Sequence, residues 1–408
     1  MENKPRVRVS ITNNELNKIL PYTAIFFFCS LLLGIFLNTT SLIILFTFSV
    51  LGSWKSNSIP PLNNKLLWLI IIFVFYEIAI IFTFNTDIKA SLSELFTFVP
   101  LLLIVISFFL NSKKLNSNLF PKLEFAFIIT CLISAILNLG HGIYRGVYLT
   151  SNVNYYFLSY DYLGTVFGIQ AYYLSLFYLI GCLFIIKHKK NIKLGYIYLL
   201  ILLLSIFLLA SRMTILISLI SLPVYFYTTI ANKKHLFKIG LIGLLLFIST
   251  FLFNPILKER ISNVNSKSTN YSGIELRKKI WKNSYEVFKE SPIFGYGMQN
   301  TNEKLMGQYK KIRFRAATRN KYHSHNQFIQ TSLDSGLIGL LLLLAIIVIT
   351  GYNLYQNKQI TYLFAYVCLI GTMLTESLFQ RQWGLFLFAF FVGISLVKPL
   401  KEDDKIEI

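Results

Sequence analysis

Charged residues are scarce in this sequence: Asp, Glu, Lys and Arg make up 14% of its 408 residues, while 55% are hydrophobic and 16% aromatic. A chain with so few charges is atypical of a soluble domain and typical of a polytopic helical membrane protein. Cysteine is also rare. All four copies lie inside apolar runs rather than in loops, at Cys29, Cys131, Cys182 and Cys368. This placement argues against a disulfide framework and against a cysteine metal motif.

The sequence also lacks an internal repeat and a cleavable signal peptide. Met1–Lys18 is polar and basic, and the first apolar run is long enough to be a retained membrane span. The apolar runs predict about twelve transmembrane helices, of which the second is short for a bilayer. They lie at residues 20–37, 39–52, 66–84, 94–110, 124–139, 164–186, 194–210, 212–230, 236–254, 337–354, 360–378 and 382–398.

The distribution of positive charge predicts the topology. If the N-terminus is cytoplasmic, the inner loops and both tails carry twenty Lys and Arg. The short outer loops then carry four, namely Lys89, Arg145, Arg212 and Arg381. Such an asymmetry is the positive-inside pattern of membrane proteins, and it places both termini in the cytoplasm.

One long polar segment, residues 255–325, interrupts the apolar pattern. It carries fifteen Lys and Arg against five acidic residues, a net charge of +10. Loops of this length escape the positive-inside rule, so we place it on the outer face. The chain then divides into spans one to nine (1–254), this large periplasmic loop (255–325), and a motif helix with three spans and a cytoplasmic tail (326–408). The cations call for an anionic partner, either lipid headgroups or a phosphorylated substrate, and nucleic acid is not expected outside the cytoplasm.

A helix is predicted inside this loop. Ser272, with a Glu three residues later, has the form of a capping box, and the pattern continues to about Glu290. Arg277 would lie on the Trp281 side of this helix. The nearby lysines are typical of a solvated or headgroup-facing surface, whereas the mixed pattern of residues 300–321 predicts no particular structure.

The stretch YHSHNQFIQTSLDSGLIG, residues 322–339, follows the loop. Ser324 and Gln327 form a second capping-box pattern, which predicts that a helix starts here with His325 as its first residue. The positive end of a helix dipole disfavours an imidazolium ion, so the ring would be neutral and able to accept a proton. Alternatively, His325 only decorates a helix at the membrane surface.

Two further outer features have alternative interpretations. Arg212 interrupts an apolar run with Lys-rich flanks, which predicts a hairpin with its tip at Ser211-Arg212. An arginine there either serves function or forms a structural ion pair, for example with Glu376 or lipid phosphate. The Tyr-rich loop at residues 141–162 is typical of a membrane interface, although its rings could also stack on sugars.

The residues from His325 to Gly339 read H-N-x9-G-x-x-G, with Gly336 as the first closing glycine. This pattern resembles the signature of bacterial O-antigen ligases, which recurs in the wider superfamily of O-antigen ligases and polymerases. The spacing selects His325 rather than His323. The layout is also similar, with one large loop before the motif, an Arg that opens a span (Arg212), and a second Arg on the loop helix followed by S-P-I-F-G-Y-G.

The resemblance implies roles for three residues. In that family two arginines bind the lipid-linked pyrophosphate and the histidine is catalytic, and these roles fall here on Arg212, Arg277 and His325. It further implies a GT-C-like glycosyltransferase of the bacterial inner membrane, in contact with membrane lipids and with its active site at the periplasmic face. The donor would be a glycan on undecaprenyl pyrophosphate and the acceptor lipid A–core or another glycan.

The chemistry that this assignment requires is simple. Pyrophosphate leaves as a stable anion, so the enzyme must stabilise its charge and supply a base for the incoming sugar hydroxyl. Arginine offers a planar fork for phosphate oxygens, and a neutral histidine can take the proton. The outer loops hold no Asp/Glu pair or histidine cluster of the kind that binds a divalent metal. We therefore expect inverting transfer without a metal or another cofactor.

Three functions remain open at this point. The first is an O-antigen ligase acting on lipid A–core. The second is an O-antigen or exopolysaccharide polymerase, whose acceptor is a second lipid-linked glycan. The third is a flippase or other transporter, which should place charges deep within several spans and often shows repeats. The sequence does not define the sugars, the linkage, the oligomeric state, or the roles of His323, Glu376, Arg381 and the Tyr-rich loop.

Overall fold

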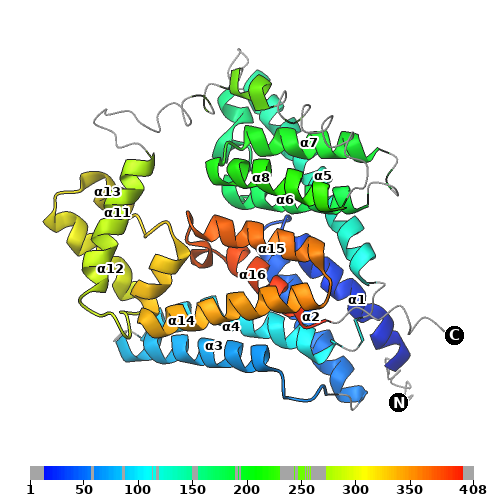
Figure 1. The fold of residues 1–408 in the computed structure, drawn as a ribbon, viewed down its shortest axis with the longest axis horizontal. Coiled ribbons are helices and arrows are strands. Elements are labelled where there is room, and N and C mark those ends of the chain that lie inside the picture. The colour runs from blue at the N-terminus through cyan, green and yellow to red at the C-terminus, as the bar shows by residue number, and fades with distance from the viewer. Residues whose placement is uncertain are drawn as a thin grey trace, which may run out of the picture.

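The computed structural model describes residues 13–56, 59–84, 88–112, 119–148, 155–188, 194–229 and 273–397, with a few positions between these ranges. Within them every regular element is a helix, which confirms the all-α class (Figure 1). The predicted span at 236–254, residues 259–272 of the large loop and both chain ends lie largely or wholly outside the described residues.

The apolar body is built from helices that overlap the predicted spans. They are α1 (Asn13–Ser30), α2 (Ile35–Lys55), α3 (Lys65–Phe84), α4 (Ile88–Leu110), α5 (Leu119–Tyr148), α6 (Ala171–Lys187), α7 (Gly195–Leu208), α8 (Arg212–Thr229), α14 (Gln327–Gln356), α15 (Ile360–Met373) and α16 (Gln382–Ser395). Among the described residues, α2, α3, α5 and α14 are long and apolar enough to cross a membrane, and six apolar helices of 10–17 residues accompany them. The total of twelve spans therefore remains a prediction.

Two helices form the centre of this body. Almost every side chain of α6 and α16 is buried, as expected for helices that are apolar all round. In Figure 1, α15 and α16 lie between α5–α8 on one side and α1–α4 with α14 on the other. Phe28 of α1 stacks on Phe390 of α16 with ring centroids 3.9 Å apart, and on Phe127 of α5 at 4.1 Å. These aromatic contacts join three helices at one level of the core.

The expected hairpin at Arg212 is present. Helix α7 ends at Leu208 and α8 begins at Arg212, with a turn between them in which Ala210 has a left-handed φ of 48°. Two short 3₁₀ helices, η1 (Tyr155–Leu158) and η2 (Tyr160–Tyr162), precede α6, and a third, η3 (Leu378–Gln380), lies between α15 and α16.

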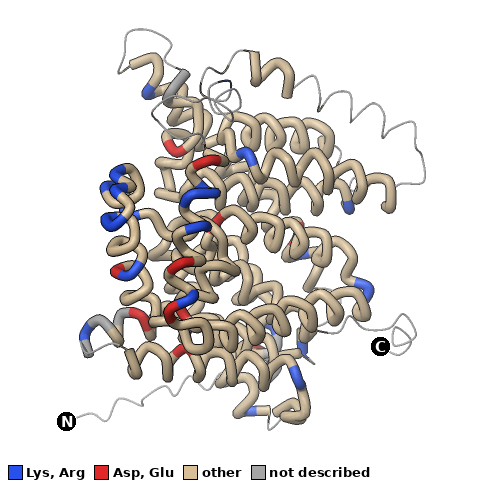
Figure 2. The backbone as a smooth tube through the Cα atoms, turned by 60° about the vertical axis from the view of Figure 1, so that its left-hand side comes forward, with Lys and Arg blue, Asp and Glu red and all other residues tan. Residues whose placement is uncertain are grey.

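A polar lobe of three helices extends from one side of the apolar body (Figure 1). It contains α11 (Gly273–Phe288), α12 (Met298–Lys311) and α13 (Arg315–Asn320), the last two in the segment whose pattern predicted no structure. The predicted loop helix is confirmed as α11, although its Ser272 cap lies outside the described residues. Ile280, Val287, Leu305, Tyr309 and Phe314 form a separate core for this lobe. Figure 2 shows charged residues gathered over the lobe, while most of the apolar body carries few.

Helix α14 is kinked at Gly336, where φ is 66° and ψ is −164°. This backbone conformation is essentially restricted to glycine. A Cβ on Gly336 would lie 2.0 Å from the carbonyl oxygen of Ile293, so no larger residue fits without backbone movement. The kink therefore brings α14 into direct backbone contact with the S-P-I-F-G-Y-G turn of the loop.

Backbone hydrogen bonds join these two segments on both sides of the kink. Tyr296 N donates to Leu333 O at 3.0 Å and Gly297 N to Asp334 O at 2.8 Å. In the opposite direction, Leu337 N donates to Pro292 O at 2.8 Å. The S-P-I-F-G-Y-G turn and the glycine motif of α14 therefore contact each other directly, and this contact holds the lobe against α14.

Candidate active site

The start of α14 differs from the sequence prediction. The cap is Asn326, whose Oδ1 accepts from Phe328 N at 2.9 Å and Ile329 N at 3.1 Å, so the helix begins at Gln327. Ser324 does not cap the helix, because its hydroxyl donates to Asn326 O. The prediction that His325 is the first helical residue was therefore wrong. Asparagine is at least as strong a cap as serine, and it stands closer to the apolar run.

His325 instead lies in the turn before the cap, with a left-handed φ of 50°. A non-glycine residue held in this region is strained and is often part of a functional site. The backbone N–H of His325 donates to Nδ1 of His323 at 3.1 Å. Burial lowers the pKa of His323 to about 4, and the nearby His325 and Arg381 act in the same direction. His323 is therefore neutral at pH 7 and can accept this hydrogen bond, which supports the strained turn.

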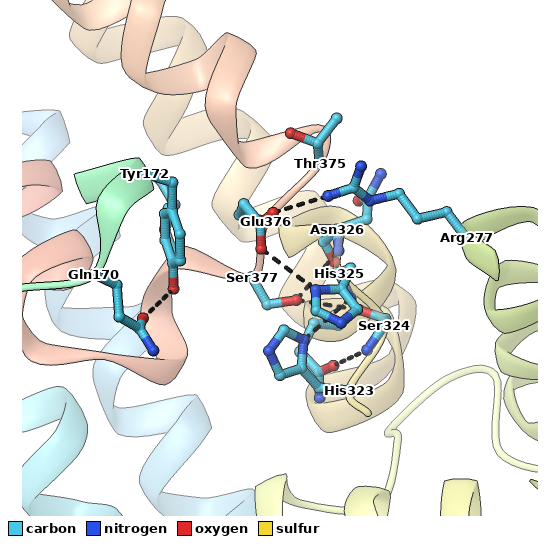
Figure 3. Close-up of polar contacts among 12 residues, drawn as sticks. Gln170, Tyr172, Arg277, His323, Ser324, His325, Asn326, Thr375, Glu376 and Ser377 are labelled. Carbon is cyan, nitrogen blue, oxygen red and sulfur yellow. Dashed lines mark hydrogen bonds and ion pairs between the residues drawn. The ribbon is translucent and has the colours of Figure 1, made fainter. Parts of the chain in front are cut away.

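The side chain of His325 faces Glu376, a residue whose role the sequence left open. Nδ1 of His325 lies 3.3 Å from Oε2 of Glu376, and the other carboxylate oxygen accepts from Nη2 of Arg277 at 2.9 Å (Figure 3). Arg277 comes from α11, His325 from the turn before α14, and Glu376 from the segment after α15. The structure thus brings together two of the three predicted site residues through one carboxylate.

This arrangement defines which imidazole nitrogen can act as a base. A carboxylate beside Nδ1 favours the tautomer with its hydrogen on Nδ1, and Nε2 then carries the free lone pair. The same geometry is used by histidine bases that an Asp or Glu orients. The helix-dipole argument made from the sequence does not apply to this ring, because His325 is not in the first turn of α14.

Glu376 was considered from the sequence only as an ion-pair partner for Arg212, but its ion pair is with Arg277. The available signal was a carboxylate inside the predicted span at residues 360–378, where an unpaired charge is costly. Its partner could not be read from the sequence, because Arg277 lies 99 positions away.

Buried hydrogen bonds hold the histidine turn against the segment that carries Glu376. Asn326 Nδ2 donates to Leu374 O at 2.9 Å, and Asn326 N donates to Ser377 Oγ at 3.2 Å. Phe379 N donates to Oε1 of Gln327 at 2.8 Å. Asn326, the second residue of the motif, therefore both caps α14 and fixes the loop opposite His325. A well-connected buried network of this kind makes the site rigid.

Helix α11 is fixed beside the same turn. Nε1 of Trp281 donates to Ser324 O at 2.9 Å. Trp281 follows Arg277 by one helical turn, so both residues lie on the side of α11 that faces the histidine segment. The sequence predicted that Arg277 and Trp281 share one side of this helix.

Arg212 reaches the first residue of α11. A Cβ on Gly273 would lie 2.6 Å from Nη1 of Arg212, so the guanidinium packs closely against this glycine. One helical turn separates Gly273 from Arg277, a rise of about 6 Å. The side chain that opens α8 and the side chain on α11 therefore approach the same end of α11.

Tyr172 and Gln170 lie on the side of Glu376 opposite Arg277 (Figure 3). The hydroxyl of Tyr172 donates to Oε1 of Gln170 at 2.6 Å. The neighbouring Tyr173 donates to Leu378 O at 2.9 Å, which joins the start of α6 to η3. Among the described residues no group of three or more His, Cys, Asp or Glu is placed to hold a metal ion.

The fold and site together define an all-helical protein with membrane-length helices and a polar histidine–carboxylate–arginine site at one side of the apolar body. Residues 197–344 match the family described as O-antigen ligase, a range that includes Arg212, Arg277, His325 and both motif glycines. This match confirms the resemblance to the O-antigen ligase family that was drawn from the motif.

A comparison with curated proteins also matches only part of this chain. An uncharacterized protein of Haemophilus influenzae is 27% identical over 146 residues. The aligned part covers 34% of this chain and 37% of that protein, so the match spans little more than a third of either.

Proposed function

We propose that this protein is an O-antigen ligase that transfers a glycan from undecaprenyl pyrophosphate to a sugar hydroxyl of lipid A–core. The observation that carries the proposal is the contact of His325 Nδ1 with Glu376, whose other oxygen binds Arg277. This arrangement supplies a base at Nε2 of His325 next to a cation that can bind phosphate.

In the proposed reaction the acceptor hydroxyl gives its proton to Nε2 of His325. Its oxygen attacks the anomeric carbon of the donor sugar, and the bond from that carbon to the pyrophosphate oxygen breaks. The electron pair leaves with the pyrophosphate, and a single displacement inverts the anomeric carbon. Glu376 stabilises the imidazolium that forms, and a positioned base of this kind contributes about a hundredfold to ten-thousandfold.

The two arginines would hold the leaving pyrophosphate. Arg277 uses one nitrogen for Glu376, and its guanidinium has further N–H groups that can bind phosphate oxygens. Arg212 packs at the start of α11, where the backbone N–H groups and the helix dipole also favour an anion. Close cations of this type stabilise charge as it develops on a leaving group.

The proposed location follows from the lipid donor and the charge pattern. The donor's undecaprenyl chain stays in the bilayer, so its pyrophosphate lies at the membrane boundary, beside a lobe that is rich in Lys and Arg (Figure 2). We place this lobe in the periplasm and the apolar helices in the bacterial inner membrane. The partners are then the lipid-linked donor, the acceptor glycan and membrane lipids.

A polymerase would use the same base and the same arginines with a second lipid-linked glycan as acceptor. Transfer assays with the purified protein and lipid-linked donor separate the two functions. We expect a product on lipid A–core with an inverted anomeric centre, formed in the presence of EDTA. Chain extension on lipid-linked glycan alone would assign a polymerase, and transfer to neither acceptor would refute the proposal.

A further inference from the structure

A cleft lies at the opposite end of α11 from Arg277. It has a volume of about 610 Å³ and is bordered by the end of α11, by α12 and by Phe84 at the end of α3. Sites for small molecules have volumes of about 300–1,000 Å³, so this cleft is large enough for a ligand. None of the residues assigned to the active site lines it.

The lining of the cleft combines apolar surface with polar groups, and its charged groups balance. It includes two carboxylates (Glu290 and Glu303), two ammonium groups (Lys304 and Lys311), and the side-chain amide of Asn300. Within the described part of the chain, neither Glu303 nor Lys311 has a hydrogen-bond or ion-pair partner. A phosphate group would favour cations alone, and an acyl chain would favour apolar residues. Donors and acceptors in equal measure instead suit a ligand rich in hydroxyl groups, since each hydroxyl both donates and accepts.

Hydrogen bonds hold the walls of the cleft in place. Asn300 Nδ2 donates to Phe84 O at 2.8 Å, which attaches α12 to the end of α3. The hydroxyl of Tyr296 donates to Val287 O at 2.9 Å, and Lys304 lies over its ring. Burial, assisted by Glu290, raises the pKa of Tyr296 to about 12, so its hydroxyl stays neutral. The cleft is therefore built before any ligand arrives.

The same residues connect the cleft to the active site. Tyr296 N donates to Leu333 O on α14. Leu333 is seven residues beyond the cap of α14, a distance of about 10 Å along the helix. The cleft thus lies a short way along α14 from His325. A glycan chain that extends from the reacting sugar could enter it.

We propose that this cleft binds a segment of the glycan chain, several sugars away from the bond that is made. The inference rests on the proposed function for the presence of a glycan at His325. The chain could belong to the donor or to the acceptor, because both present the same hydroxyl chemistry. Binding there would make the enzyme favour longer chains over short ones.

Direct binding tests this proposal without any transfer reaction. The probes are the free glycan released by mild acid from the lipid-linked donor and the core oligosaccharide released in the same way from lipid A. The protein is the full chain in nanodiscs. We expect one of the two probes to bind, and Glu303→Gln with Lys311→Met to weaken it about tenfold, since each change removes a charged hydrogen-bond partner. Lys310→Met is the matched control, because this exposed neighbour does not line the cleft.

Equal binding by the parent protein and the double variant, or binding of neither glycan, would overturn the proposal. Binding of glycerophosphoethanolamine, but of neither glycan, would assign the cleft to a lipid headgroup instead. A second measurement compares KM for donors with one and with several repeats. The parent should favour the longer donor, and the double variant should lose most of that preference. Failure of the parent to transfer any glycan would refute the proposed function, whereas the binding result stands separately.

Discussion

Oε2 of Glu376 lies 3.3 Å from Nδ1 of His325, although the two residues are 51 positions apart in the chain. The contact orients the imidazole and directs the lone pair of its other nitrogen away from the carboxylate. It also explains why an acidic side chain, only partly exposed, stands at the end of an apolar helix: Arg277 balances the charge, and His325 contacts the other carboxylate oxygen.

Substitution of Glu376 should separate its role in orienting His325 from the effect of its negative charge. Glu376→Gln keeps the size of the side chain but loses the charge that stabilises the imidazolium, so we expect turnover to fall about a hundredfold or more. Glu376→Asp should retain more activity than Glu376→Gln. The measurement is kcat for glycan transfer, with donor binding followed in parallel. Equal activity of the Gln variant and the parent would contradict the role assigned to Glu376.

His325→Ala should lose turnover while the protein still inserts in the membrane and binds the donor. The loss should be about a hundredfold to ten-thousandfold, the usual contribution of a positioned base. His323→Ala should reduce activity much less, because this ring only accepts a hydrogen bond from the backbone of the turn. Single-turnover transfer and donor binding measure both effects. Equal losses at the two positions would reject His325 as the base.

Substitution of Arg277 or Arg212 should reduce activity or donor binding more than substitution of the lysines on α11. Arg277→Lys keeps the charge but loses the planar fork, so activity should fall strongly. Arg212→Ala should weaken donor binding, since a charge-assisted contact contributes about 1.5–3 kcal/mol. Lys278→Ala and Lys282→Ala are the controls on the same helix, each worth about 1 kcal/mol at most if the side chain only faces headgroups.

Donor binding and glycan transfer, measured for these four variants, test whether the arginines and the lysines have different roles. Lys279 is less suitable as a control, because its ammonium lies over the ring of Phe314 at 4.4 Å. If the lysine changes match the arginine changes, the donor is held by a diffuse basic surface and the two-arginine site is wrong.

Gly336→Ala should destabilise the contact between the lobe and α14. Its Cβ would overlap the carbonyl of Ile293, and the left-handed backbone adds strain of about 1–3 kcal/mol. We expect a lower thermal midpoint and faster proteolysis of the lobe. Gly140→Ala on α5 is the matched control, since nothing lies within 4 Å of its Cβ and alanine favours a helix. A parent-like midpoint for Gly336→Ala would show that the kink is not required.

Thiol labelling in intact cells tests the predicted topology. The four native cysteines are buried, so an impermeant reagent should give little background. Lys310→Cys on α12 should label from outside the inner membrane, because the lobe is expected in the periplasm. Gln356→Cys, at the opposite end of α14, should label only after the inner membrane is permeabilised. The reverse pattern would place the lobe and its site in the cytoplasm.

Local signals in the sequence were sufficient for the apolar helices and for α11, and they indicated several candidate site residues. Long apolar runs can satisfy their backbone in a membrane only as helices, so the positions of α3, α8 and α14 followed from composition. Arg212 stood out as an isolated charge in an apolar run, whereas Arg277 was selected through the resemblance to O-antigen ligases. His325 was selected by its spacing to Gly336 and Gly339.

The tertiary structure decided what these residues contact. Ser324 and Asn326 can both cap a helix and lie within three positions of each other. The hydrogen bond from Asn326 to Leu374 O favours Asn326 as the cap of α14. The sequence alone did not pair Glu376 with Arg277 and His325, because a contact between distant positions depends on how α11, α14 and α15 pack. The same holds for Gly273, whose missing side chain matters only because Arg212 lies against it. Patterns along the chain determine helices, whereas the geometry of the site depends on contacts between them.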